Sequence, residues 1–287
     1  YQPFTLLENV GRVADVRAAD FRGIGKLDLI VGVFGWRNNG EIMYLENRTT
    51  DWSHPVFAPR VVDDHHGTIH VPVCDLNGDG KPDFVALISQ EHEMIVAFVN
   101  DGHGHFERQI VYRAPHPAYG SSGIQIVDLN GDGKPDILYS NGDIMDPPPL
   151  YKPYHGIQWL ENKGGLHFTH HPIEPMYGAM RAVAAKAGGK HDLFAVSWLP
   201  VERFPDRQMV QPDAILWLEN TGTNHYVRHA LEQVACDHLT CATGDVFGDG
   251  RTCLVTGNYY LDARHPAASA VDIWKGPARH DAKPGKR

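Results

Sequence analysis

One acidic motif recurs five times along this chain, and that repetition constrains its fold more than any other feature. Its copies begin at residues 20, 75, 128, 184 and 245 and read DFRGIGKLDLIVG, DLNGDGKPDFVAL, DLNGDGKPDILYS, AAKAGGKHDLFAV and DVFGDGRTCLVTG. A second motif follows each copy, as IMYLEN (42–47), VAFVND (96–101), IQWLEN (157–162), ILWLEN (215–220) and DIWKG (272–276). Because both motifs keep their order in every unit, we expect the chain to fold as five similar units.

Each unit contains the pattern of four short strands. In the second unit these are IHVPVC, DFVALI, MIVAFVN and HFERQIVY, rich in β-branched and aromatic residues and bounded by Gly, Asn, Asp and Pro. No amphipathic helical period extends over a useful length. Four-stranded units at this spacing predict an all-β fold, a β-propeller whose blades surround an axis and protect their sheet edges.

The ends of the chain predict how the ring closes. The repeats lie near 10–64, 65–117, 118–174, 175–234 and 235–276, so residues 1–287 are expected to form a single domain. The polar sequence after residue 276 cannot supply a fourth strand, whereas PFTLL within residues 1–10 resembles the fourth-strand segments HFERQI, HFTHH and HYVRHA. We therefore expect five blades, closed by the N-terminal strand, which completes the last blade. Five blades of a larger, for example seven-bladed, propeller and a right-handed β-helix are the alternatives.

Composition narrows the class of protein. Hydrophobic residues make up 42% of the chain, which is enough for a packed core. The formal charge of -9 argues against nucleic acid as a partner, and no apolar run is long enough to span a membrane. The spacing of Cys236 and Cys241 allows either a local disulfide or two free thiols. Because the chain begins at Tyr1, we expect a processed or excised product that could be part of a larger polypeptide or assembly.

The motifs DLNGDGKPD and WLEN resemble the FG-GAP or VCBS repeats of β-propellers such as the integrin α-subunit head and many secreted bacterial proteins. The resemblance covers nearly the whole chain and implies an extracytoplasmic protein (secreted, periplasmic or on the cell surface) with calcium in its hairpin loops. The chain also resembles planctomycete-type repeat proteins, which are often fused to c-type cytochrome domains. Since no CxxCH motif is present, any electron-transfer role would lie outside this chain. Activity stays open, because the family includes binding modules, adhesins, polysaccharide lyases and a sugar dehydratase.

Two of the five acidic loops carry a full set of oxygen ligands. In DLNGDGKPD the oxygen-bearing side chains stand at positions 1, 3, 5 and 9 with glycine at position 6, and calcium binds about six to eight oxygens. We predict two structural Ca²⁺ sites, with a lysine carbonyl as the remaining protein ligand of each. Their ligands are Asp75, Asn77, Asp79, Lys81 and Asp83 in one loop and Asp128, Asn130, Asp132, Lys134 and Asp136 in the other. A solvated acidic hairpin without metal is the alternative.

The opposite face of the propeller carries the long loops. Segments 140–156, 197–213 and 257–269 are long for connections without regular structure, and such loops are usually functional. They carry aromatic side chains on which sugars can stack, namely Tyr151, Tyr154, Trp198, Tyr259 and Tyr260.

The segments that lead into each first strand are rich in polar side chains. Alternation along a strand would place residues seven and three positions before the acidic motif on one side, facing the axis. We predict a polar ring formed by Arg17, His66, His70, Tyr119, Gln125, Tyr177, Arg181 and His238. Arginine could hold a carboxylate, and histidine could bind a transition metal or transfer a proton. Because the chain has 18 histidines, a metal-free polar mouth and the lack of any small-molecule site remain open.

Three functions are compatible with these patterns. The first is a calcium-stabilised propeller that binds a carbohydrate or protein partner through its long-loop face, with Arg17, His66, Tyr119, Gln125, Trp198 and Tyr259 as ligand-binding residues. The second is a metal-assisted lyase or dehydratase acting on a sugar or uronate, with His70, His238, Tyr177 and Arg181 as catalytic residues. The third is a docking domain of a larger periplasmic redox or surface assembly.

Overall fold

The computed structural model describes residues 2–35, 39–145, 148–187, 190–222, 224–262 and 269–276, and in them the strands form five antiparallel sheets. The first sheet contains β1 (Val13–Ala19), β2 (Asp28–Val33), β3 (Glu41–Asn47) and β4 (Phe57–Asp63). The second contains β5 (Thr68–His70), β6 (Val73–Cys74), β7 (Asp83–Ile88), β8 (Met94–Asn100) and β9 (Phe106–Arg113), with the short 3₁₀ helix η1 (Gln90–His92) after β7. Because β5 and β6 both pair with β7, they together take the place of one first strand.

The remaining three sheets repeat this order. The third contains β10 (Ser121–Val127), β11 (Asp136–Asn141), β12 (Gly156–Asn162) and β13 (Phe168–Pro175). The fourth contains β14 (Ala179–Ala187), β15 (Lys190–Ser197), β16 (Asp213–Gly222) and β17 (His225–Gln233), with the helix α1 (Arg207–Val210) between β15 and β16. The fifth contains β18 (His238–Gly244), β19 (Cys253–Asn258) and β20 (Val271–Lys275). The predicted all-β fold with propeller-type blades is therefore confirmed.

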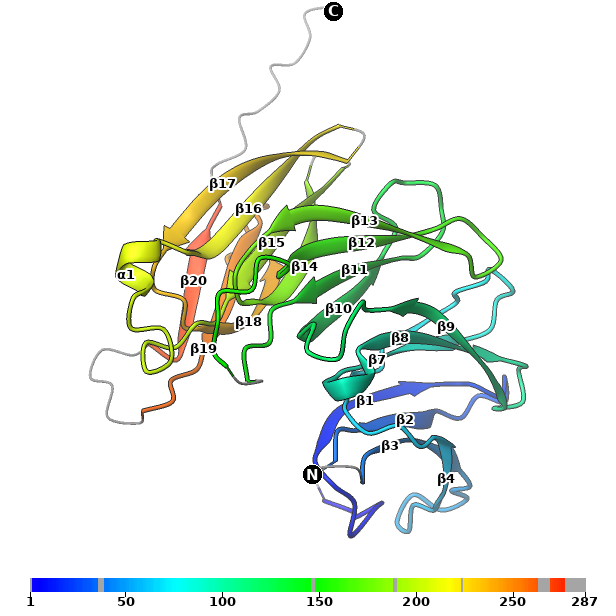
Figure 1. Ribbon diagram of the computed structural model, residues 1–287. Helices are drawn as coiled ribbons and strands as arrows, with labels where there is room; N and C mark the ends of the chain where they lie inside the picture. Colours follow the sequence, from blue (N-terminus) through cyan, green and yellow to red (C-terminus); the bar gives the residue numbers. More distant parts are fainter. Residues whose placement is uncertain are drawn as a thin grey trace, which may run out of the picture.

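The sheets follow one another in an arc, with the first sheet (blue) and the fifth (orange to red) at its two ends (Figure 1). Their first strands contact one another in the order β1, β5, β10, β14 and β18. Neither described helix has the length and apolar character needed to span a lipid bilayer. The cysteines Cys74, Cys236, Cys241 and Cys253 are all free thiols, so Cys236 and Cys241 are not bridged.

The hydrophobic core lies between neighbouring sheets. One cluster joins the first and second sheets and includes Phe21, Tyr44, Phe84 and Phe98. Similar clusters lie between the second and third, the third and fourth, and the fourth and fifth sheets. Each blade thus buries its apolar faces against its neighbours, as the repeat pattern predicts.

The N-terminal segment does not complete the last blade as the sequence suggested. No strand is assigned within residues 2–12, and the described part of the fifth sheet has three strands. Instead, Leu6, Leu7 and Val10 pack against the first sheet, on a cluster formed by Val31, Val33, Met43 and Leu45. The physical reason is that this face of the first blade has no neighbouring blade to cover it, so Leu6, Leu7 and Val10 are partly buried there.

One hydrogen bond recurs in the first four sheets and connects the two sequence motifs. The ninth residue of the acidic motif is an aspartate whose Oδ1 accepts the backbone N–H of the asparagine in the second motif. We call this the Asp–Asn contact. Its four pairs are Asp28 with Asn47 at 2.7 Å, Asp83 with Asn100 at 2.8 Å, Asp136 with Asn162 at 2.8 Å and Asp192 with Asn220 at 2.9 Å.

The same asparagines also link neighbouring blades. The Nδ2 of Asn100 donates to the Phe21 carbonyl at 2.8 Å, and that of Asn162 donates to the Leu76 carbonyl at 3.3 Å. In the fifth unit, Cys253 and Gly276 stand where the aspartate and the asparagine would be. Both partners are replaced together in that unit, which indicates that they act as a pair.

We predict that Asp192→Ala lowers the free energy of unfolding by about 2–4 kcal/mol, because it leaves two donors without their charged acceptor. These donors are the Asn220 backbone amide and the Trp217 indole, which lies 3.0 Å from Asp192 Oδ2. The fourth unit is suited to this test because no calcium site is predicted there. Urea unfolding measures the change, with Asp64→Ala as the control, since the side chain of Asp64 is 95% exposed. Equal stability of the two variants would contradict a structural role for the contact.

Candidate ligand-binding site

A cavity of about 360 Å³ lies where the five sheets converge, on the side of the long loops. Every sheet contributes to its wall. The contributing residues include Phe34 after β2, His70 in β5, Ser122 in β10, Trp198 after β15 and Tyr259 after β19. Because each sheet contributes a different side chain, this is one shared site and not a site repeated once per blade. We call it the central cavity.

Three of the predicted site residues, His70, Trp198 and Tyr259, line the central cavity. The side chain of Tyr259 is available to a ligand, since the residue is 48% exposed. Trp198 is only 3% exposed, and its indole Nε1 donates to the Tyr259 carbonyl at 2.9 Å. The two rings lie 5.7 Å apart between centroids. Trp198 therefore positions the loop that presents Tyr259 and does not itself offer an open stacking face.

A charged cluster on the first strands lies next to the cavity and contains Asp15, Arg17, His70 and Arg181. Arg181 Nη1 lies 3.2 Å from His70 Nε2. Because a guanidinium can only donate, Nε2 accepts, and the ring proton belongs on Nδ1. That nitrogen faces Asp15 Oδ2 at 3.9 Å, and Arg17 pairs with the same carboxylate at 3.1 Å. Arg17, His70 and Arg181, which the sequence placed together, do gather in the structure.

The charge of Asp15 is stabilised in this cluster. Burial acts to raise its pKa, but contacts with His70 and the Val71 backbone amide outweigh that effect and leave the pKa below its usual value. The Val71 amide donates to Asp15 Oδ2 at 2.9 Å. Asp15 is therefore ionised at neutral pH and fixes the orientation of both His70 and Arg17.

The other predicted ring residues are absent from the cavity wall. His238 is buried between Glu232 and Asn258, with a nitrogen 2.6 Å from an oxygen of each. Burial opposes its protonation, but the hydrogen bonds to these two residues prevail and raise its pKa. It connects the fourth blade to the fifth.

The predicted tyrosines, glutamine and second histidine also have partners of their own. Tyr119 is buried and stacks on Tyr154, with ring centroids 5.4 Å apart. The Tyr177 ring packs against the Tyr151 ring, with centroids 5.3 Å apart. Gln125 Oε1 accepts the Ala184 amide at 2.6 Å and so joins β10 to β14. His66 lies in a different group, 3.1 Å from Glu91.

A β-bulge in each first strand explains why some of the residues predicted to face the axis do so and others do not. Each first strand shifts register near its start, between Val13 and Asp15, Thr68 and His70, Ser121 and Gly123, Ala179 and Arg181, and His238 and Thr240. A bulge adds one residue to a strand and so breaks the strict alternation of side chains. Two residues an even number of positions apart then point to opposite sides if the bulge lies between them. His70 and Arg181 follow their bulges and share the axial cluster, whereas His238 precedes its own bulge and is buried between blades.

In the two predicted calcium loops, the side chains at positions 1 and 3 hold the turn through hydrogen bonds from backbone amides. In the second unit, Asp75 accepts the amides of Gly78 and Gly80 at 2.8 Å, and Asn77 Oδ1 accepts the Asp79 amide at 2.9 Å. The loop of the third unit repeats these bonds through Asp128 and Asn130. Each oxygen keeps a further lone pair, so the side chains at positions 1, 3 and 5 fit a hard cation such as calcium.

Position 9 of these loops has a second role. Asp83 and Asp136 are fully buried and form the Asp–Asn contact, and their second oxygens accept the amides of Leu76 and Leu129. In the first unit, where no calcium was predicted, Arg22 supplies positive charge by pairing with Asp28 at 2.8 Å and Glu46 at 3.0 Å. In the first unit an arginine therefore stands beside the aspartate at position 9.

We predict that the chain binds two Ca²⁺ ions and that Asp79→Ala and Asp132→Ala each remove one, because each loses a carboxylate ligand. Asp249→Ala, at the equivalent position of the fifth loop, is the control and should leave the number unchanged. Isothermal titration calorimetry after chelation measures the stoichiometry, and added calcium should raise the melting temperature of the wild type. Two ions in all three variants would show that these loops are not the sites.

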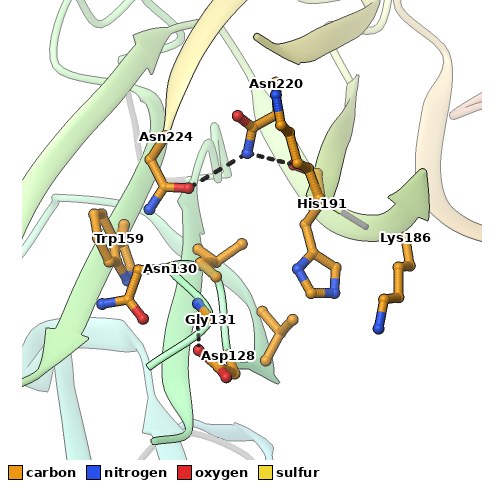
Figure 2. A pocket seen from close by; sticks show the side chains of 11 residues that line it. Asp128, Asn130, Gly131, Trp159, Lys186, His191, Asn220 and Asn224 are labelled. Carbon is orange, nitrogen blue, oxygen red and sulfur yellow. Dashed lines mark hydrogen bonds between the residues drawn. The ribbon is translucent and has the colours of Figure 1, made fainter. Parts of the chain in front are cut away.

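A second, polar cavity of about 660 Å³ lies beside the acidic loop of the third unit. Figure 2 shows Asp128, Asn130 and Trp159 on one side and Lys186, His191 and Asn220 on the other. Asn220 Nδ2 donates to the His191 carbonyl at 3.2 Å and to Asn224 Oδ1 at 3.4 Å. Some polar groups of this wall are therefore hydrogen-bonded to one another. Only the third and fourth units contribute to this cavity, and the central cavity is the stronger candidate site.

Comparison with known proteins supports the repeat assignment. The FG-GAP-like repeat family matches residues 75–139. No curated protein matches the chain. Similar solved structures include the Tc holotoxin pore of Photorhabdus luminescens, at 13% identity and a TM-score of 0.34, over 96% of this chain but 14% of that one. Another is a GH32 β-fructofuranosidase of Bombyx mori, at 11% identity and a TM-score of 0.35, over 87% of this chain and 69% of that one.

The family match spans the second and third acidic motifs, which are the two with the full set of oxygen-bearing side chains. Residues 75–139 thus form an FG-GAP-like repeat, within a chain of five β-propeller-type sheets.

Proposed function

We propose that this chain is an extracytoplasmic, calcium-stabilised propeller that binds a carbohydrate in the central cavity. The observation that carries this proposal is the wall of the cavity, to which all five sheets contribute and in which Tyr259 stays half exposed. Ligand pockets typically combine apolar and aromatic walls with a few fixed polar groups, at volumes of about 300–1,000 Å³. The calcium and the location outside the cytoplasm rest on the resemblance of the acidic loops to FG-GAP repeats.

The polar groups of the cavity favour a ligand that donates hydrogen bonds. Ser122 Oγ donates to the Ala179 carbonyl at 2.7 Å, and Ser89 Oγ donates to the Gly67 carbonyl at 3.1 Å. With their protons engaged, both hydroxyl oxygens offer only lone pairs to a ligand. Sugar hydroxyls are suitable donors, and the Tyr259 ring suits the C–H face of a sugar. An uncharged saccharide therefore fits better than an anionic one.

We predict that Tyr259→Ala weakens the affinity for the bound oligosaccharide at least tenfold, because the ring supplies the apolar contact area. Tyr260→Ala is the matched control, since this neighbouring tyrosine does not line the cavity. A glycan array identifies the ligand, and calorimetric titration measures the dissociation constants with calcium present. Equal losses in both variants would contradict the site. Lack of any glycan binding, together with capture of a protein partner, would favour the docking function.

A lyase or dehydratase acting on a uronate is the second candidate, favoured by the axial cluster of Arg17, His70 and Arg181. Two arginines could neutralise a carboxylate, and His70 Nε2 has the lone pair that a general base needs. Arg181 occupies that lone pair at 3.2 Å, so the substrate would have to displace the arginine before proton transfer.

If this candidate is right, uronic-acid oligomers will give an unsaturated product, and His70→Ala will lower its rate of formation at least a hundredfold. Ultraviolet absorbance of the new double bond measures the rate. His103→Ala is the control, because His103 is exposed in an outer turn. The same rate in both variants, or no product in the wild type, would exclude catalysis by this cluster.

A further inference from the structure

A histidine and glutamate cluster lies on the second blade, apart from the calcium loops and the axial cluster. His66 comes from the segment between β4 and β5, and Glu91 and His92 belong to η1 after β7. One ligand atom of each residue lies within 4.8 Å of the other two, and His66 Nε2 is 3.1 Å from Glu91 Oε1. Because zinc ligands lie about 2.0–2.2 Å from the ion, these three side chains would move slightly closer together to bind one.

We propose that His66, Glu91 and His92 form a binding site for a divalent transition metal, with zinc as the best-fitting ion. Two imidazoles and one carboxylate are the ligand set of a three-coordinate protein site that leaves a fourth position open. Imidazole ligands favour zinc and its neighbours over calcium and magnesium, which prefer oxygen. This site is therefore chemically distinct from the two acidic loops.

The unsatisfied nitrogen of His92 points to a ligand independently of the cluster geometry. His92 Nε2 is buried and has no hydrogen-bond partner among the described residues. A buried polar atom without a partner is costly, and a metal would satisfy it.

The two segments that carry the ligands are held together by the backbone. The Ser89 amide donates to the Gly67 carbonyl at 2.9 Å, directly beside His66 and η1. At the other end of η1, the buried Glu93 accepts the Ser121 amide at 2.8 Å, which ties η1 to the third blade. The backbone segments that carry the ligands are thus held together before any metal binds, and Ser89 lies in the wall of the central cavity.

A neighbouring acidic group is a weaker candidate. Asp63, Asp64 and His65 also lie within 4.8 Å of one another. However, Asp63 already accepts His65 Nδ1 at 2.6 Å and Arg108 Nε at 2.6 Å, so its charge is compensated. The His65 and His92 rings pack edge to face, with centroids 4.7 Å apart, so His65 restricts the orientation of the proposed ligand.

The test is zinc titration of the full chain without a histidine tag, in saturating calcium so that the acidic loops do not compete. Wild type should bind one zinc per chain, and cobalt in its place should give the visible absorption of a tetrahedral site. Glu91→Gln and His92→Ala should each weaken zinc binding at least tenfold. Glu91→Gln keeps the fold because the side chain is 62% exposed, and His103→Ala is the histidine control.

Three outcomes would overturn the proposal. These are no zinc binding by wild type, unchanged affinity in both Glu91→Gln and His92→Ala, or an equal loss in His103→Ala. Since the readout is metal binding alone, the result is independent of whether the central cavity binds a carbohydrate.

Discussion

The Asp–Asn contact is the interaction on which the rest of the structure depends. An aspartate at the start of the second strand of a blade holds the end of its third strand, and in the second and third blades the asparagine also bonds to the preceding blade. A charged acceptor buried from water makes these bonds stronger than ordinary ones. The Asp–Asn contact thus fixes the position of the acidic loop on one face of the blade. Because the blades are arranged around a common centre, the long loops come together on the other face.

The sequence predicted the five units, their strands and the side of each loop, because two motifs with defined chemistry repeat in a fixed order. It also identified Asp83 and Asp136, although as calcium ligands, since a single chain does not reveal that position 9 pairs with an asparagine elsewhere in the blade. The prediction for residues 1–10 was wrong because PFTLL is compatible with any apolar surface. Local sequence does not decide between a distant sheet edge and the uncovered face of the first blade, against which Leu6 and Leu7 pack.

The candidate site was predictable in part. Arg17, His70 and Arg181 were found from strand alternation, and Tyr259 from the length of its loop. His238 was misplaced because a bulge in its strand inverts the alternation, and bulges have no clear sequence signature here. Tyr177 and Tyr119 were misplaced because they lie before their strands begin, at Ala179 and Ser121. Glu91 and His92 were not among the predicted site residues, because they lie in a short loop, SQEHE at residues 89–93, and the prediction from loop length relied on the long ones. Its acidic and imidazole side chains, read together with HH at residues 65–66, were the available signal.

Hydrogen–deuterium exchange with and without a bound oligosaccharide can show whether one site is built from several blades. We expect slower exchange in segments from different sheets at once, around residues 67–70, 120–123 and 257–261, which surround the central cavity. The acidic loops at 75–83 and 128–136 should exchange at unchanged rates when calcium is constant. Protection confined to a single blade, or to the face of the acidic loops, would show that the central cavity is not the binding site.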